Sequence, residues 1–346
     1  MPAPSRDKLD EALATIKRLS SVTKAAIVLN MPRTTLSEWV QTAKAMGIYE
    51  KPETNELQAI NDNLRRELDI AREALQNATK PRYTIRQDIA GESDELLVIA
   101  MGDAHDDPTI PDKSRFYQAG RYVRDLKPDV FVSIGDFLNM NSLCFHIPNE
   151  NYSGKAKPTF LTDIASGREA FAALNDGMGS CKPEKHKKKG NHEHRIDRIE
   201  DQAPESYGMY TSLYDEMMVN AGFTYSPYGS TSFYGGVGFT HIALSIMGKP
   251  VGGKDVLNAM GRDSVYDTVT GHTHSPGKKI TRKIGGRHIT SVDTGCFLPY
   301  GHIEDFAQHT YGGWDWGLTE LRIKNRQIVG YKWISLLELQ ERYGHG

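Results

Sequence analysis

The chain has 346 residues, of which 38% are hydrophobic and 25% are charged, and its formal net charge is -2 at pH 7. That length accommodates a catalytic domain and a smaller module, and the small net charge excludes a global attraction to nucleic acid. No apolar run approaches the roughly 20 residues that a membrane helix needs, and the amino terminus lacks an apolar signal segment. The three cysteines, Cys144, Cys181 and Cys296, have no paired spacing. We therefore expect reduced thiols in a soluble, cytoplasmic protein without a membrane partner.

Residues 1–50 carry the apolar periodicity of three short helices. The pattern predicts a first helix over residues 7–19, a second over 22–29, and a third that begins at Arg33 after a turn at Asn30-Met31-Pro32. The buried stripe of the third helix is expected to consist of Leu36, Trp39, Val40 and Ala43.

The stretch from Ser21 to Leu36 is similar to helix-turn-helix DNA-binding segments of the Fis-like type. The resemblance implies that residues 1–50 form a DNA-binding domain whose third helix enters the major groove. The implied DNA contacts are Arg33, Thr34, Thr35, Lys24 and Lys44. Because the basic surplus of this segment is slight, a three-helix module that binds protein or packs on the rest of the chain is the alternative.

Residues 51–82 are predicted to form a helical linker. Apolar residues recur at steps of three or four from Leu57 to Leu75, which is typical of a helix with a narrow apolar seam. Such a seam either pairs two chains as a short coiled coil through residues 56–76, giving a homodimer, or docks on the chain's own catalytic domain. That domain is expected to occupy residues 83–346.

The catalytic segment opens with a strand, a helix and a strand. Residues 96–101 and 130–134 are continuous apolar runs of strand length, and an amphipathic helix is predicted between them. Asp103 and His105 follow the first run, and Asp136 follows the second. This layout predicts an α/β fold that builds its site at the carboxyl ends of its strands.

Three further motifs follow along the chain: Gly190-Asn191-His192-Glu193, then His241, then Gly271-His272-Thr273-His274. The five motifs in this order resemble those of the calcineurin-like metallophosphoesterases, over roughly residues 95 to 300. The resemblance implies a four-layer α/β/β/α sandwich and two metal ions. One ion would be held by Asp103, His105 and His274, the other by Asn191, His241 and His272, and Asp136 would bridge the pair.

The same resemblance implies that His192 is the catalytic histidine. Glu193 or a backbone carbonyl would fix its tautomer, and a hydroxide between the ions would attack the phosphorus. Imidazoles, carboxylates and an amide oxygen without cysteine favour two divalent ions of borderline character, with Mn ahead of Fe and Zn.

Residues 185–189 depart from the family pattern, because four lysines stand where a buried apolar strand is expected. We expect either an exposed segment or lysines that extend outward while their stems pack. The run is either a basic rim that holds a polyanion or a solvated loop. Lys189 and Arg195 are the candidate phosphate contacts, and Arg195 serves equally well in a structural ion pair.

Downstream, a hairpin is predicted from strands over residues 278–284 and 288–293 around Gly285-Gly286. Residues 314–323 are expected to add a strand to the second sheet. The aromatic residues of this region are expected to pack in the core.

Together these patterns favour a metal-dependent phosphodiesterase that hydrolyses DNA and is brought to it by the amino-terminal module. A tethered DNA-binding unit raises the effective concentration of the active site on its substrate. The combination resembles proteins encoded in phage genomes. The alternatives are a phosphatase or cyclic-nucleotide phosphodiesterase with a small substrate, and a DNA-bound regulator without turnover.

Overall fold

The computed structural model divides into two compact units, residues 1–78 and 79–346. It describes residues 5–19, 21–49, 65, 95–145, 157–245, 247–251, 255–304, 307 and 311–344. Nearly all of the predicted linker at residues 51–82, including the predicted coiled coil at 56–76 apart from residue 65, lies outside the described residues.

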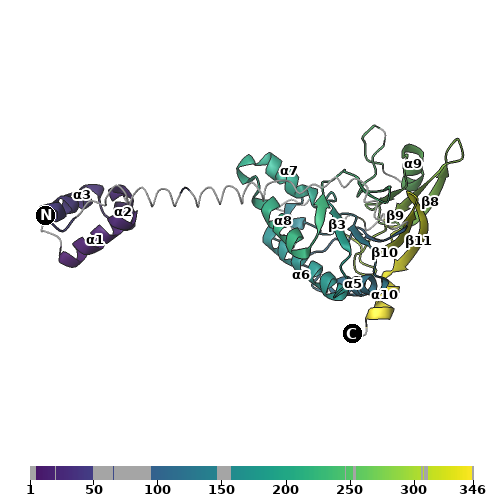
Figure 1. The fold of residues 1–346 in the computed structure, drawn as a ribbon, viewed down its shortest axis with the longest axis horizontal. Helices are drawn as coiled ribbons and strands as arrows, with labels where there is room; N and C mark the ends of the chain where they lie inside the picture. Colours follow the sequence, from purple (N-terminus) through teal and green to yellow (C-terminus); the bar gives the residue numbers. More distant parts are fainter. Residues whose placement is uncertain are drawn as a thin grey trace. The chain divides into compact units, whose positions relative to one another are not determined.

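The amino-terminal unit contains three helices, α1 (Arg6–Leu19), α2 (Val22–Val28) and α3 (Arg33–Ala45), drawn in purple in Figure 1. The Ser21 side chain caps α2 by accepting a hydrogen bond from the Lys24 backbone N–H at 3.3 Å. The three predicted helices are therefore confirmed. Their apolar faces form one small core of Ala12, Ile16, Ala25, Ala26, Leu36 and Val40.

The second unit begins with the predicted strand, helix and strand. β1 (Glu95–Met101) and β2 (Val130–Ser133) pair in parallel, and α5 (Ser114–Leu126) connects them. The apolar face of α5 packs into the same hydrophobic cluster as Phe131 of β2. The predicted α/β arrangement of this segment is confirmed.

These strands belong to a six-stranded mixed sheet with the order β11-β10-β1-β2-β3-β4. Its other members are β3 (Glu184–Lys188), β4 (Thr224–Ser226), β10 (Gly317–Lys324) and β11 (Gln327–Ser335). The prediction that residues 314–323 extend the second sheet is wrong. β10 pairs antiparallel with β1, with Leu321 opposite Val98, so its apolar residues complete the first sheet.

The second sheet has five strands in the order β5-β6-β7-β9-β8. They are β5 (Ser232–Tyr234), β6 (Val237–Phe239), β7 (Thr268–Thr270), β8 (Gly277–Arg282) and β9 (His288–Asp293). β8 and β9 form the predicted antiparallel hairpin. Gly285 and Gly286 both have positive φ at its turn, a conformation that glycine adopts at little cost.

One apolar cluster joins the two sheets. Residues of β1 and β2 contribute to it together with residues of β6, β7 and β9. On the other face of the first sheet, a second apolar cluster includes residues of the helices α6 (Phe160–Met178), α8 (Met209–Ala221) and α10 (Leu336–Tyr343), which Figure 1 shows there. The helix α9 (Val256–Asp263) packs against β8 and β9 of the second sheet. Among the described residues, every helix is too short or too polar to cross a membrane.

The lysine-rich segment is a buried strand, so the predicted exposed or outward-pointing lysines are wrong. Lys187, Lys188 and Lys189 are at most 1% exposed. Lys187 Nζ lies 2.7 Å from Glu193 and Lys189 Nζ lies 2.6 Å from Asp197. Lys188 Nζ donates to Ser230 and Ser232. A buried ammonium needs a counter-charge or hydrogen-bond acceptors, and each lysine has one or the other.

Lys188→Met is expected to stabilise the fold at acidic and neutral pH. Lys188 has hydroxyl acceptors and, within the described part of the chain, no carboxylate partner, and burial lowers its pKa to about 7. Between pH 7 and about 10.5 the unfolded chain binds a proton here that the folded chain lacks, so the parent's free energy of unfolding rises with pH.

Below pH 7 the parent carries the full cost of a buried ammonium, and Lys188→Met removes it. After the loss of two hydrogen bonds is deducted, we expect a gain of about 2–4 kcal/mol at pH 6 that disappears near pH 10. Urea unfolding at both pH values measures it. A gain that does not depend on pH would contradict this explanation.

Candidate metal centre

The predicted ligands lie where strands of the two sheets end. Asp103 and His105 follow β1, Asp136 follows β2, and Asn191 follows β3; in the second sheet His241 follows β6, and His272 and His274 follow β7. The strands β1, β2 and β3 run parallel, as do β6 and β7, so their carboxyl ends lie at one edge of each sheet.

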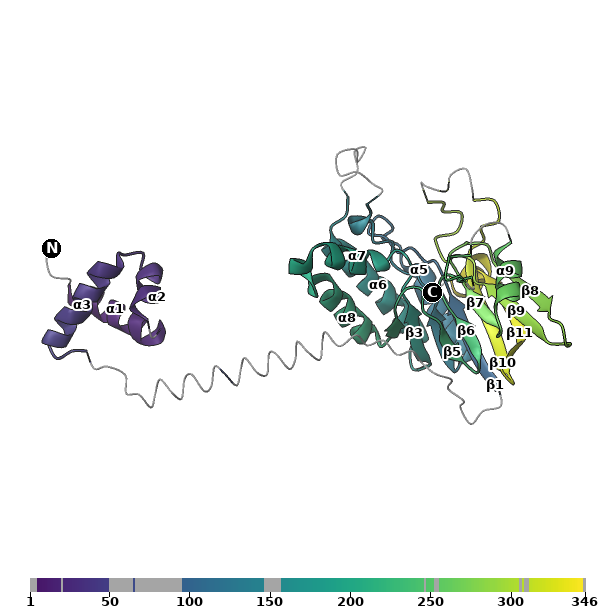
Figure 2. The same ribbon diagram turned by 90° about the horizontal axis from the view of Figure 1, so that it is seen from above.

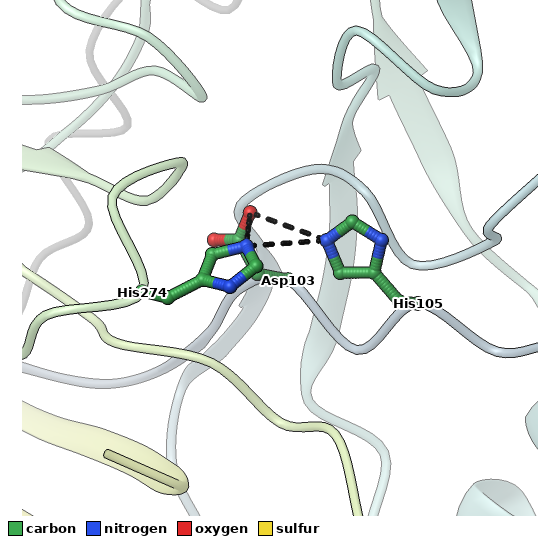
Figure 3. Close-up of side chains that lie close together, drawn as sticks. All are labelled: Asp103, His105 and His274. Carbon is green, nitrogen blue, oxygen red and sulfur yellow. Dashed lines mark hydrogen bonds and ion pairs between the residues drawn. The ribbon is translucent and has the colours of Figure 1, made fainter. Parts of the chain in front are cut away.

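A first donor group consists of Asp103, His105 and His274, and Figure 3 shows the two imidazoles directed toward the carboxylate. The Nε2 atoms of the two histidines are 3.2 Å apart. His274 Nε2 lies 3.4 Å from Asp103 Oδ1, and His105 Nε2 lies 3.9 Å from the same oxygen. Three donor atoms of different residues therefore meet at one point, which is the arrangement that a metal ion requires.

A second group consists of Asp136, His241 and His272. His241 Nε2 lies 3.4 Å from Asp136 Oδ2 and 3.0 Å from the Asn191 side-chain oxygen. The rings of His241 and His272 are 5.1 Å apart. The structure thus brings the predicted ligands of the second ion together as well.

Asp136 lies between the two groups. Its Oδ2 is 3.4 Å from His241 Nε2 of the second group and 4.0 Å from His105 Nε2 of the first. His192 Nε2 is 3.9 Å from the same oxygen. One carboxylate oxygen therefore faces both candidate metal positions and the predicted catalytic histidine.

The donor chemistry fits cations. Asp103 Oδ1 is buried and accepts no hydrogen bond among the described residues, a costly state for a carboxylate unless a cation lies beside it. Burial raises the pKa of Asp103 and of Asp136, but the neighbouring histidines outweigh it and hold both pKa values below the ordinary range. Burial, together with His192 and His274, lowers the pKa of His105 well below its usual value. Charged carboxylates and a neutral imidazole are the forms that bind metal.

The backbone at this site is strained. Of the ten described non-glycine residues with positive φ, five are predicted ligands: Asp103, His105, Asp136, His272 and His274. Side chains rarely adopt this conformation, and each instance costs on the order of 1–3 kcal/mol. Five positive φ angles at one site indicate that the fold holds these side chains in position against the conformational preference of their own backbone.

The glycines of the motifs allow close approach. A Cβ atom on Gly190 would overlap the Asp136 backbone nitrogen, and one on Gly271 would overlap Asp103 Oδ2. A Cβ on Gly135 would lie 2.5 Å from the His241 ring. A glycine therefore makes room for a candidate ligand in each of these three motifs.

Glu193 supports the loops of the site and does not orient His192. Its carboxylate is fully buried and accepts hydrogen bonds from the backbone N–H groups of Asp136, Leu138 and Gly190, and from Lys187 Nζ. The predicted catalytic role of Glu193 is therefore corrected to one of support. A backbone carbonyl, that of Asn139, accepts the hydrogen bond from His192 Nδ1 at 2.7 Å instead.

Arg195 and Lys189, the two predicted phosphate contacts, lie in different environments. Arg195, in the first turn of α7 (His194–Gln202), donates to the Asn139 and Met140 carbonyls and has Nη2 3.4 Å from His192 Nε2. Lys189 is 0% exposed and its ammonium is bound to Asp197, so its assignment as a phosphate contact is wrong.

The predicted DNA contacts lie on the surface of the amino-terminal unit. Arg33 and Thr34 are exposed in the first turn of α3 and Thr35 is half-buried; Lys24 and Lys44 are exposed. The Lys44 ammonium lies over the Tyr49 ring.

Two residues next to the ligands were not predicted as part of the site. Trp314 packs against His274 with ring centroids 4.1 Å apart. Asp293, the last residue of β9, accepts a hydrogen bond from the Thr273 hydroxyl at 2.7 Å and from the Gly295 backbone N–H. Asp293 thus fixes the residue between His272 and His274. A lone carboxylate at the end of a predicted strand was the available signal.

Comparisons with known proteins leave the family open. No family model matches the sequence, and there is no significant match among curated proteins. Three solved structures each match 70% of this chain at 10% sequence identity. One is a crystal structure matched over 99% of its own length, with a TM-score of 0.37, and another is TT1561 of Thermus thermophilus, also matched over 99% of its length, with a TM-score of 0.30. The third is GAP50, the anchor in the inner membrane complex of Plasmodium, matched over 85% of its length with a TM-score of 0.28. At these scores the likeness establishes neither a common fold nor a common function.

Proposed function

We propose that this chain is a dinuclear metal-dependent phosphodiesterase that hydrolyses DNA. The observation that supports it most is the position of Asp136 Oδ2, which lies within 4.0 Å of His105, His241 and His192. Two donor groups that share one carboxylate suit two ions held close together, and such pairs serve in-line displacement at phosphorus. The proposal includes the calcineurin-like sandwich, which the shared apolar cluster between the two sheets supports.

Each ion would have its own ligands in addition to Asp136. Asp103, His105 and His274 would hold one, and Asn191, His241 and His272 the other. Mixed imidazole and oxygen donors without thiolate favour Mn, with Fe and Zn as the other candidates. When bound, the two ions would neutralise the charge of a phosphodiester and lower the pKa of a water for attack.

His192 would donate a proton to the leaving oxygen. Since Nδ1 donates to the Asn139 carbonyl, the hydrogen bond fixes the ring so that Nε2 faces Asp136 and the reacting group. Burial lowers the pKa of His192, and Arg195 lowers it further. An anionic phosphate next to Nε2 opposes both effects and favours the protonated ring that a general acid requires.

Arg195 would bind a non-bridging phosphate oxygen. Its Nη1 is occupied by two backbone carbonyls, and its Nη2 lies 3.4 Å from the neutral acceptor Nε2 of His192. A phosphate oxygen that enters between Arg195 and His192 would receive hydrogen bonds from both.

The amino-terminal unit would bring the metal centre to DNA. The exposed first turn of α3 carries Arg33 and Thr34 free of buried packing, in the position that a recognition helix offers to a groove. Tethering this unit to the centre raises the local concentration of phosphodiesters.

The test is hydrolysis of circular DNA, linear DNA and a bis-aryl phosphodiester with added Mn, by the parent chain, His192→Ala and Asp136→Asn. We expect the parent to cut DNA and both variants to lose activity. His192→Ala should lose about 10²–10⁴-fold, the usual contribution of a general acid. Turnover of the small ester alone would overturn the assignment to DNA, and DNA binding without hydrolysis of either substrate under any metal would overturn the assignment as an enzyme.

A further inference from the structure

The β8–β9 hairpin carries a surplus of positive charge. Residues 277–288 contain five lysines and arginines and neither aspartate nor glutamate, although the whole chain has a net charge of -2. The five are Lys278, Lys279, Arg282, Lys283 and Arg287, and all but the half-buried Lys283 are exposed. We call this group the basic hairpin.

Protection of a sheet edge does not account for this charge. β8 is an edge strand, and lysines on edges hinder pairing with other chains. However, the edge strands β4 and β5 contain no charged residue, and β11 has only Lys332, whose ammonium lies 3.9 Å from Glu338. Among the four edge strands of the described sheets, β8 alone has a positive charge without carboxylates.

Most of this charge is not neutralised within the structure. Lys283 and Arg287 donate to backbone carbonyls of Arg262 and Val265, and Lys278 lies over the Tyr331 ring. The side chains of Lys279 and Arg282 form no hydrogen bond or ion pair with another described residue. These two cations are therefore available to a ligand.

The basic hairpin starts at the metal centre. β8 begins at Gly277, three residues after the candidate ligand His274, and runs along the outer end of the second sheet beside α9 (Figure 2). At the usual rise of a strand, Lys278 and Arg282 are about 13 Å apart. A small phosphate ester at the centre is too short to reach along this line, whereas a polymer is long enough.

We propose that the basic hairpin binds the phosphate backbone of a nucleic acid strand whose scissile phosphodiester lies at the metal centre. The inference rests on the proposed function and specifies its substrate as a polymer. The repeated phosphates of a nucleic acid match cations spread along β8. The half-exposed Ile280 side chain, between Lys278 and Arg282, offers apolar contact to a sugar. The contacts carry no sequence information, since they involve the backbone alone.

The test compares the full-length parent with Lys279→Glu/Arg282→Glu. The matched control is Lys127→Glu/Lys182→Glu, two exposed lysines at the amino ends of β2 and β3, away from the centre. With Mn, kcat/KM is measured for a 20-nucleotide single strand and for a bis-aryl phosphodiester at several salt concentrations. Binding of the labelled strand is measured by anisotropy without metal.

We expect the hairpin variant to lose at least tenfold more kcat/KM on the strand than on the small ester, while the control stays within twofold of the parent. The slope of log affinity against log salt should fall by about 1.4, since each phosphate contact on a single strand contributes about 0.7. Equal losses on strand and ester, or unchanged binding, would overturn the inference. The inference would also be overturned if the hairpin variant lost as much affinity for polyglutamate as for the single strand, which would indicate an acidic protein as partner.

The two proposals fail separately. If the parent hydrolyses neither substrate, the proposed function is wrong, and anisotropy alone then tests whether the basic hairpin binds the nucleic acid strand. If the parent hydrolyses both substrates and the hairpin variant matches it on each, the proposed function stands and the basic hairpin is not a binding surface.

Discussion

Asp136→Asn is expected to lower turnover of a bis-aryl phosphodiester by about 10³-fold or more. The substitution keeps the size of the side chain but replaces the carboxylate that faces both donor groups, and metal ions supply several kcal/mol of charge stabilisation at phosphorus. An amide in that position is neutral and a weaker ligand. We therefore expect both ions to bind less tightly, whereas His274→Ala should chiefly affect the first ion and His272→Ala the second.

Metal content per chain and turnover with added Mn measure this effect together. Asp125→Asn is the matched control, because Asp125 is exposed near the end of α5, where it contacts Arg124 and Tyr343. Circular dichroism checks that the Asp136→Asn chain is folded. Retention of two ions and of parental turnover would show that Asp136 does not link the two groups.

The grouping of the ligands could be predicted because it follows from strand order. Asn191 follows the lysine-rich strand β3, the other motifs come directly after short strand-like runs, and the carboxyl ends of parallel strands meet at one edge. The positive φ at Asp103, His105 and Asp136 could not be predicted, since these residue types rarely adopt it. Packing of the surrounding loops imposes it.

The sheet assignment of residues 317–324 could not be predicted from their pattern. Leu321 and Ile323 of β10 alternate with the exposed Arg322 and Lys324 as in any half-buried strand, and the pattern does not specify whether β1 or a strand of the second sheet is the neighbour. Pairing with β1 joins segments more than 200 residues apart, and only the tertiary fold selects it.

The buried lysines show how composition misleads. Four lysines in five residues indicated exposure, yet the carboxylates that neutralise two of them follow within eight residues, at Glu193 and Asp197. The signal was the spacing between each lysine and a later acid. It can be interpreted only once the chain is known to turn back after β3, so that Glu193 and Asp197 reach Lys187 and Lys189.

Glu193→Gln is expected to destabilise the fold by about 3–5 kcal/mol. Its carboxylate neutralises the buried Lys187 ammonium and accepts three backbone N–H groups. A glutamine has one acceptor oxygen, and its NH₂ group would face donors, so the substitution leaves a buried cation and unpaired N–H groups. Because Asp136 and Gly190 are among the supported residues, metal affinity should fall as well.

Lys187→Met is expected to cost less, because the remaining Glu193 carboxylate keeps three N–H donors. The ammonium left by Glu193→Gln keeps the Lys188 carbonyl at 3.3 Å and the Phe137 ring, and neither carries a negative charge. The double variant should be more stable than the sum of the two single losses predicts, since neither buried charge is then unpaired. Urea unfolding of all three chains measures these free energies. Lys332→Met, at a surface ion pair, is the control and should change stability by less than about 1 kcal/mol. If Lys187→Met costs as much as Glu193→Gln, the backbone hydrogen bonds do not stabilise the carboxylate, and the support of the metal loops by Glu193 is wrong.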